Sequence, residues 1–221
     1  MQNLYGMCGV ILAAGASSRM GTDKALLPWP PAASGHTLLS AAIASLKPFT
    51  QAIVVVVGKN ARNLAPVIAA NGALMVLNPE PERGQFSSFQ IGLRQVLALG
   101  HNAAIITLVD CPPLSAPSLQ HLRVSFDRAL ALGKWGVAPE KDGKHGHPLL
   151  AGPQLIEAFL QAPLASNARE VKRLHAHLIE SIPVPDSLLT VDVNTPEEYA
   201  ALAAQSAAQP AARPHERLSG S

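Results

Sequence analysis

The chain has 221 residues, of which 48% are hydrophobic, 14% charged and 4% aromatic, and its formal net charge is +2. That length suits one domain of ordinary size with a substantial core, and the composition excludes a largely disordered protein. The balance of 17 Lys and Arg against 15 Asp and Glu argues against a general nucleic-acid binder, which usually carries a basic face.

Two features of the sequence bear on the cellular compartment. The cysteines, Cys8 and Cys111, lie in separate apolar strand-like runs, so we expect no disulfide framework and a reducing environment. The N-terminus lacks the basic and long apolar stretches of a signal peptide, and the longest apolar runs are too short to span a bilayer. We therefore expect a cytoplasmic protein with no membrane partner.

Strands and helices are predicted to alternate through the first 130 residues. Continuous apolar runs predict strands at 9–14, 52–58, 74–77 and 103–109, and helical patterns lie at 37–46, 61–70, 85–99 and 117–132. Continuous apolarity indicates burial on both faces, which is typical of a parallel sheet covered by helices. The pattern therefore predicts a doubly wound α/β fold.

The second half of the chain is less regular. Strands are predicted at 135–139 and 147–151 around an Asp142-Gly143 turn, helices at 153–161 and 168–177, and short strands at 182–184 and 190–193. Thr195 is expected to cap a last helix at 196–204, with Glu198 completing a capping box. We expect one domain over residues 7–204 and a disordered tail over 205–221.

The most informative segment is VILAAGASSRMGTDK, residues 10–24, in which a buried strand leads into small residues. Gly15 and its small neighbours allow a tight bend whose N–H groups converge on an anion. Arg19 and Lys24 would grip a triphosphate and stabilise a leaving pyrophosphate. A plain Gly/Ser connection with solvated basic residues is the alternative, and neither GxxxxGK[ST] nor GxGxxG is present.

A second motif, AAIITLVDCPP, ends an apolar strand in one carboxylate, Asp110. Ligands of open α/β sheets bind outside the carboxyl ends of strands, where Mg²⁺ takes one or two carboxylates plus phosphate oxygens. On the residues alone, an Asp that opens a Pro-Pro turn is equally compatible. Cys111 has no evident activating base, so we interpret it as a small filler and not as a nucleophile.

Further polar segments have both functional and structural interpretations. In NPEPERGQFSSFQIG, residues 78–92, the hydroxyls and free N–H groups of the helix start can read a base or ribose, although Ser87 can equally be a cap. Gly92 is expected to let this helix pack closely on the sheet. His145 and His147 have no third metal ligand nearby. Basic residues of the later helix are expected to form a solvated face; they are Arg169, Lys172 and Arg173.

The segment LAAGASSRMGTDKALLPW resembles the LAAGxxxRMGxxK signature of the MobA-like nucleotidyltransferases, and is especially similar to the branch that includes the molybdenum cofactor cytidylyltransferases. With the LVDCPP and DVNTPEEY motifs, the resemblance covers roughly residues 8–203. It implies a three-layer Rossmann-like nucleotidyltransferase fold with a predominantly parallel, mixed sheet. It also implies Mg²⁺-dependent transfer of CMP from CTP to a phosphate-bearing acceptor, molybdopterin, with release of pyrophosphate.

The resemblance assigns roles to individual residues. It implies catalytic roles for Arg19, Lys24 and Asp110, an acceptor-binding role for His147, and metal binding by Asp110 with either Asp192 or Asn194. The second metal ligand stays open because the two side chains would share one face of an extended strand, and this chain has Asn where several relatives have Asp. The implied nucleotide-binding residues are Leu12, Ala13, Ala14, Gly15, Arg19, Lys24, Asn78, Gly84 and Ser88.

Three alternatives remain at this stage. GTP could replace CTP as donor, giving a molybdenum cofactor guanylyltransferase. A sugar-1-phosphate nucleotidylyltransferase would normally need a longer chain. A non-catalytic cofactor-binding module is disfavoured because Arg19, Lys24 and Asp110 are all present.

Overall fold

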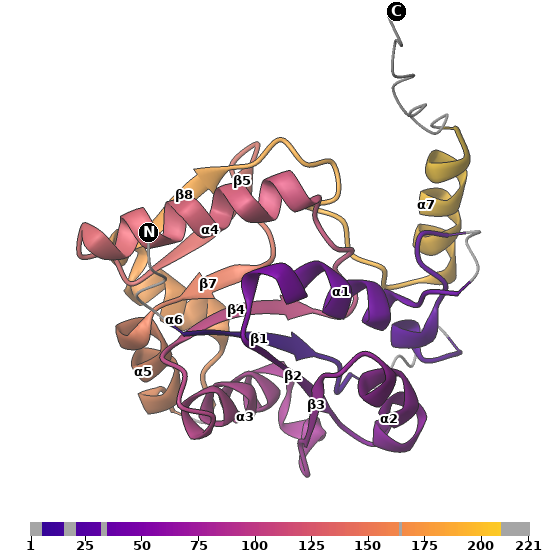
Figure 1. Ribbon diagram of the computed structural model, residues 1–221, viewed down its shortest axis with the longest axis horizontal. Coiled ribbons are helices and arrows are strands. Elements are labelled where there is room, and N and C mark those ends of the chain that lie inside the picture. Colours follow the sequence, from indigo (N-terminus) through magenta and orange to yellow (C-terminus); the bar gives the residue numbers. More distant parts are fainter. Residues whose placement is uncertain (1–5, 16–20, 32–34, 164, 209–221) are drawn as a thin grey trace, which may run out of the picture.

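The protein is described by a computed structural model for residues 6–15, 21–31, 35–163 and 165–208. Helices cover both faces of a central sheet (Figure 1). The strands are β1 (Met7–Leu12), β2 (Ala52–Val57), β3 (Leu74–Leu77), β4 (Ala103–Leu108), β5 (Gly136–Lys141), β6 (Lys144–His145), β7 (Leu149–Ala151) and β8 (Ile179–Pro183). Within the described residues, no helix is long and apolar enough to cross a membrane.

The strand order brings the carboxyl ends of the parallel strands to the same side of the sheet. The order is β3-β2-β1-β4-β7-β5-β6, with β8 paired to β5. Strands β1 to β4 are parallel, whereas β7 is antiparallel to β4 and β5. The amino end of β7 therefore lies beside the carboxyl end of β4. This mixed and mostly parallel sheet between helices confirms the predicted fold class.

Each face of the sheet has its own set of helices. One face packs against α1 (Leu38–Leu46), α2 (Ala61–Ala70) and α4 (Ala116–Ala131), and the other against α3 (Gln85–Ala98), α5 (Pro153–Gln161) and α6 (Ala168–Leu174). The last helix, α7 (Pro196–Ala208), lies beside α1, where Leu202 packs with Leu38 (Figure 1). Short 3-10 turns are η1 (Lys24–Leu26), η2 (Lys47–Phe49), η3 (Pro81–Arg83) and η4 (Ala176–Leu178).

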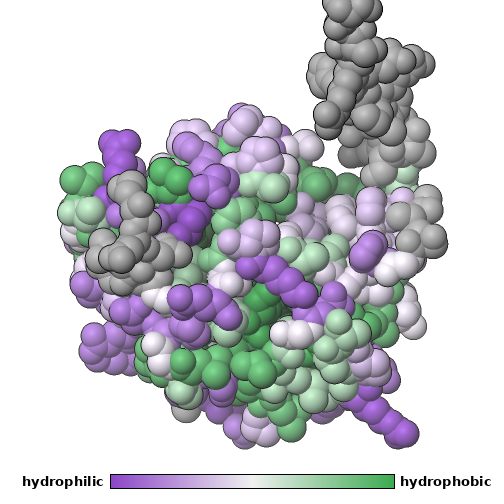
Figure 2. Space-filling view, viewed as in Figure 1, coloured by the Kyte–Doolittle hydropathy of each residue, from purple (hydrophilic) through white to green (hydrophobic). Residues whose placement is uncertain are grey.

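The core forms because both faces of the central strands are apolar. In β1, Val10 packs toward α3 and Ile11 toward α1, and both are fully buried. Gly92 of α3 faces the sheet so closely that an added Cβ would lie 2.6 Å from Val10 Cγ1. This confirms the predicted close packing of α3. Outside the core, hydrophilic and hydrophobic residues are interspersed over one face of the molecule (Figure 2).

The alternation of strand and helix in the first half is confirmed, with small shifts at the ends of elements. Strand β1 begins at Met7 and not at Gly9, and α2 and β3 have the predicted bounds. Both cysteines are free and buried, as expected. Asp142 and Gly143 have φ values of 51° and 75°, which confirms the turn, although the hairpin partner of β5 is the short β6.

Four predictions in the second half were wrong in detail. The strand predicted at 182–184 is β8, which spans Ile179–Pro183. The helix predicted at 168–177 ends at Leu174 and is followed by η4, and α7 extends to Ala208 and not only to Ala204. The segment 190–193 is not a strand. Val193 is fully buried beside α1 and α7, and its N–H bonds to Asp110 O at 2.8 Å. The apolar residues of the segment 190–193 are therefore explained by packing against helices and not by pairing in the sheet.

Candidate functional site

Asp110 follows β4 in a turn at the carboxyl edge of the sheet. The backbone around it is held on two sides, because Val109 N–H donates to Leu12 O at 3.1 Å and Val193 N–H donates to Asp110 O at 2.8 Å. The first bond ties the turn to the end of β1, and the second ties it to the segment before α7. Strand order thus brings together three parts of the chain that are far apart in sequence.

Lys24, Asp110 and Asn194 form one polar cluster at this junction. Lys24 Nζ donates to Asp110 Oδ2 at 2.9 Å and to Asn194 Oδ1 at 3.3 Å. The side chains of Lys24 and Asp110 are only 13% and 21% exposed. Partial burial strengthens the attraction between these charges relative to a surface pair. The structure therefore joins the predicted phosphate lysine to the predicted metal carboxylate.

Asp192 has a different hydrogen-bond partner from Asn194. The Cys111 thiol donates to Asp192 Oδ1 at 3.2 Å. Burial, reinforced by the negative charges of Asp192 and Asp110, raises the pKa of Cys111 well above its usual range. The thiol is therefore protonated and orients the Asp192 carboxylate, in agreement with our interpretation that Cys111 is not a nucleophile.

A cleft of about 620 Å³ opens beside the ends of β1 and β2. Ala13 is held by Val56 O, which accepts from its N–H at 2.8 Å, so the start of the predicted phosphate loop is fixed to the sheet. Arg19 lies outside the described residues. The cleft is lined by Ala14, Gly15, Gly21, Thr22, Asp23, Lys59, Asn60, Asn63, Pro81 and Glu82.

Asn60 is a site residue that our sequence reasoning missed. Its Nδ2 donates to Ala13 O and to Asp23 Oδ2, both at 2.9 Å, and its Oδ1 accepts from Gly58 N–H at 3.1 Å. One amide thus connects the ends of β1 and β2 to the start of η1. The available signal was a polar Gly-Lys-Asn sequence directly after a buried strand, the same type of signal that identified Asp110.

Asn78 and Ser88 are brought together, but their polar groups face each other. Asn78 Nδ2 donates to Ser87 Oγ at 2.9 Å and to Ser88 Oγ at 2.8 Å, and Asn78 Oδ1 accepts from Glu80 N–H at 2.9 Å. Asn78 and Ser88 are 2% and 3% exposed. They connect β3 to the first turn of α3 and so shape the loop that carries Gly84. The N-cap position is Gly84 itself, so Ser87 is not the cap.

His147 lies on the other side of Asp110, just before β7. Its Nδ1 is 3.5 Å from Ile106 O of β4. Burial, together with the positive charge of Lys172, lowers the pKa of His147. Lys172 is itself half-buried, and burial lowers its pKa as well. The prediction that the basic residues of α6 form a solvated face was therefore wrong for Lys172, although Arg169 and Arg173 are exposed as predicted.

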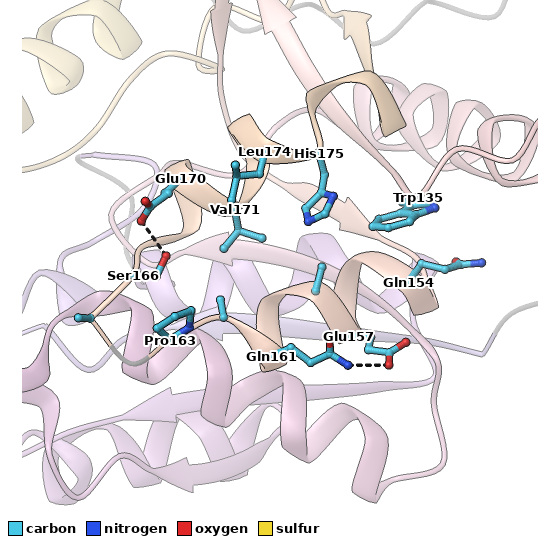
Figure 3. A pocket seen from close by; sticks show the side chains of 13 residues that line it. Trp135, Gln154, Glu157, Gln161, Pro163, Ser166, Glu170, Val171, Leu174 and His175 are labelled. Carbon is cyan, nitrogen blue, oxygen red and sulfur yellow. Dashed lines mark hydrogen bonds between the residues drawn. The ribbon is translucent and has the colours of Figure 1, made fainter.

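A second cavity, of about 800 Å³, lies between α5, α6 and Trp135 (Figure 3). Trp135 precedes β5, so the cavity lies toward the opposite edge of the sheet from Asp110. Its wall includes Glu157 and Glu170, whose carboxylates accept from Gln161 and Ser166 at 2.8 Å. None of the predicted site residues lines it, so the smaller cleft is the candidate active site despite its lower volume.

Comparisons with known proteins identify the family of the chain. The family described as MobA-like NTP transferase domain matches residues 9–181. The molybdenum cofactor cytidylyltransferase of Escherichia coli (strain K12) is 26% identical over 192 residues, which cover 86% of this chain and 92% of the relative. A probable molybdenum cofactor guanylyltransferase of Rhodopirellula baltica is 28% identical, with 87% of this chain and 89% of the relative covered.

A solved structure has the same fold. The Mycobacterium tuberculosis H37Rv protein Rv0371c superimposes with a TM-score of 0.73 at 22% identity, over 90% of this chain and 98% of that one. A further structure of that protein, in complex with manganese, has a TM-score of 0.66 at 20% identity and covers 90% of this chain and 98% of its own. Both likenesses concern the fold.

Proposed function

The chain belongs to the MobA-like NTP transferase family, and from this we propose that it transfers CMP from CTP to the phosphate of a molybdopterin-type acceptor, with release of pyrophosphate. The curated relatives include one molybdenum cofactor cytidylyltransferase and several proteins described as molybdenum cofactor guanylyltransferases or probable ones. The observation that carries the proposal is the cluster of Lys24, Asp110 and Asn194 at the edge of the sheet, beside a cleft of about 620 Å³.

The reaction we propose is an in-line displacement. An acceptor phosphate oxygen forms a bond to the α-phosphorus of the NTP, and the bond from that phosphorus to the bridging oxygen of pyrophosphate breaks. No covalent bond to the protein is needed, so the residues act by positioning and by stabilising charge. The backbone of Ala14 and Gly15 lines the cleft, and Lys24, with Arg19 outside the described residues, supplies positive charge for the phosphates.

The donor atoms at the site suit a hard divalent cation, which we propose to be Mg²⁺. Asp110 and Asn194 direct a carboxylate and an amide oxygen at one shared cation, the ammonium of Lys24. Such oxygens are the ligands that Mg²⁺ prefers, together with phosphate oxygens and water. In the part of the chain that the structure describes, no three His, Cys, Asp or Glu side chains gather into a metal site. When bound, the cation would neutralise charge on the phosphates.

The contacts favour Asn194 over Asp192 as the partner of Asp110. Asn194 shares the Lys24 ammonium with Asp110, whereas Asp192 accepts the thiol hydrogen bond of Cys111. We propose that Asp192 contributes mainly through its negative charge beside the site.

We place the acceptor on the β7 side of Asp110. Burial lowers the pKa of His147, and the half-buried Lys172 lies close enough for its positive charge to lower it further. A desolvated ammonium beside a neutral imidazole suits an anionic acceptor, because a phosphate supplies the missing negative charge. Asn78, Gly84 and Ser88 would act on the nucleotide through the shape of their loop.

The test is pyrophosphate release by the purified full chain with MgCl₂, molybdopterin and each of the four NTPs in turn. We expect release with CTP and a loss of at least about 1,000-fold in Asp110→Ala, since both charge pairing and cation binding are removed. Faster release with GTP would make the protein a guanylyltransferase. No release with any NTP, with molybdopterin or with a panel of sugar phosphates, would contradict the enzyme assignment.

A further inference from the structure

The ammonium of Lys24 stands between the two oxygens to which we assign the metal. Lys24 Nζ is 2.9 Å from Asp110 Oδ2 and 3.3 Å from Asn194 Oδ1. Both members of the ion pair are largely shielded, at 13% and 21% exposure. A cation bound by these oxygens would therefore have to share or take over the place of a positive charge that the chain already provides.

We propose that Lys24 is an internal competitor for the divalent cation, which keeps metal affinity low in the free protein until the phosphates of an NTP attract the ammonium away. This rests on the metal site of the proposed function and adds to it an order of binding. Two like charges a few ångströms apart repel strongly where solvent is scarce. The ammonium and the metal therefore do not occupy the Asp110 carboxylate together.

The local structure allows the ammonium to move without moving the backbone. Lys24 is the first residue of η1, and the side chain of Asp23 caps this turn by accepting from Ala25 N–H at 3.2 Å. Asp23 is in turn held by Asn60 Nδ2 at 2.9 Å, and Ala25 is fully buried. The backbone that carries Lys24 is thus anchored at the wall of the cleft.

The side chain of Lys24, by contrast, is a flexible stem with a compact charge. Its neighbour Asp23 lines the cleft, while its own ammonium reaches the Asp110 cluster. Rotation about the stem can therefore direct the charge either to Asp110 or to phosphates in the cleft.

This arrangement predicts reciprocal coupling between the two ligands. A nucleotide that removes Lys24 from Asp110 strengthens metal binding, and by linkage the metal strengthens nucleotide binding by the same factor. The free protein would bind a divalent cation weakly, so that the metal enters together with the nucleotide.

The test measures binding of MnCl₂ alone to the full chain, without nucleotide or acceptor, from the loss of the free Mn²⁺ paramagnetic resonance signal. We expect Lys24→Gln to bind Mn²⁺ about tenfold more tightly than the wild type, because the competing charge is gone. Lys24→Met tests the same point with another uncharged side chain of similar length. Lys24→Arg keeps the charge and should stay within about threefold of the wild type.

Two controls separate direct competition from a general change in charge. Lys59→Gln removes a positive charge that also lines the cleft, and we expect it to tighten Mn²⁺ binding by less than about twofold, since solvent and salt screen the more distant charge. Asp110→Asn combined with Lys24→Gln should abolish the gain.

Several results would overturn the proposal. They are unchanged or weaker Mn²⁺ binding by both uncharged variants, an equal gain in Lys59→Gln, or a gain that survives Asp110→Asn. Because the measurement uses the metal alone, it is independent of turnover. An inactive protein whose Lys24→Gln variant gains Mn²⁺ affinity through Asp110 would contradict the proposed reaction and still support the competition.

Discussion

The two ends of the candidate site use polar side chains in different ways. At the Asp110 end, an ammonium holds a carboxylate and an amide oxygen together through contacts that, in our proposal, a metal ion replaces. At the Asn78 end, an amide, two hydroxyls and a backbone N–H satisfy one another in the interior. Polar residues of one site can therefore serve two purposes. Those around Lys24 keep contacts that a ligand is proposed to exchange, whereas those around Asn78 stabilise the loop.

The sharpest way to break this distinction is within the Asp110 end itself. Asn194→Ala removes an oxygen that shares the Lys24 ammonium, and we expect kcat/KM to fall on the order of 100-fold. Asp192→Asn keeps the shape of a side chain that bonds Cys111 at 3.2 Å, and we expect a loss of about tenfold or less. Steady-state kinetics with CTP and MgCl₂ measure both.

We expect Asn194→Ala and Asp192→Asn to differ in activity and not in thermal stability. The thermal midpoints of both should stay near that of the wild type, because Asp192 is exposed and Asn194 is not fully buried. A larger loss of activity in Asp192→Asn than in Asn194→Ala would make Asp192 the second metal ligand.

Substitutions in the buried network around Asn78 are expected to lower the stability of the protein. Asn78→Ala removes the partner of two hydroxyls and of Glu80 N–H in a site that is 2% exposed. Leaving such groups unsatisfied costs about 1–3 kcal/mol, or a fall in Tm of about 5 °C for a chain of this size. Thermal unfolding followed by circular dichroism measures it.

The matched control lies in the same loop. Arg83→Ala breaks a surface ion pair with Glu80, whose side chains are 37% and 58% exposed. Exposed pairs contribute little, so we expect a change in Tm of about 1 °C or less. Equal effects of the two variants would show that the buried network is not what stabilises the loop.

The sequence predicts these two ends unequally well. Each motif that carries the site could be read locally, because a buried strand followed by Gly15 or Asp110 has a recognisable form. The contact between Lys24 and Asp110 could not, since it depends on β1 and β4 being neighbours in the sheet. Asn60 was missed because its function is to connect loops whose proximity only the fold creates.

The fold shows the same division. Continuous apolar runs predicted β1 to β4. The expected burial on both faces is found in β1, β2 and β4, but it was wrong for β3, the last strand of the sheet on that side, where Leu74, Met75 and Leu77 are 44%, 46% and 56% exposed. The segment 190–193 instead alternates polar and apolar residues, which is also typical of a strand, yet Val193 packs against helices and the segment is not part of a strand. Short apolar alternation reports burial on one side, and it does not say whether a sheet or a helix covers that side.

Apart from the surface control, the smallest expected effect lies at His147. Burial and the charge of Lys172 lower its pKa in the folded protein. Between the folded and the unfolded pKa values, the unfolded chain binds more protons, so the free energy of unfolding decreases as the pH falls. His147→Gln should therefore lose less Tm than the wild type between pH 7.5 and pH 5.5, by on the order of 2 °C. Lys172→Gln should give a partial version of the same change, because removing that charge brings the pKa of His147 back toward its usual value. If Tm depends on pH in both variants as it does in the wild type, the imidazole of His147 is already in contact with solvent, and burial does not lower its pKa.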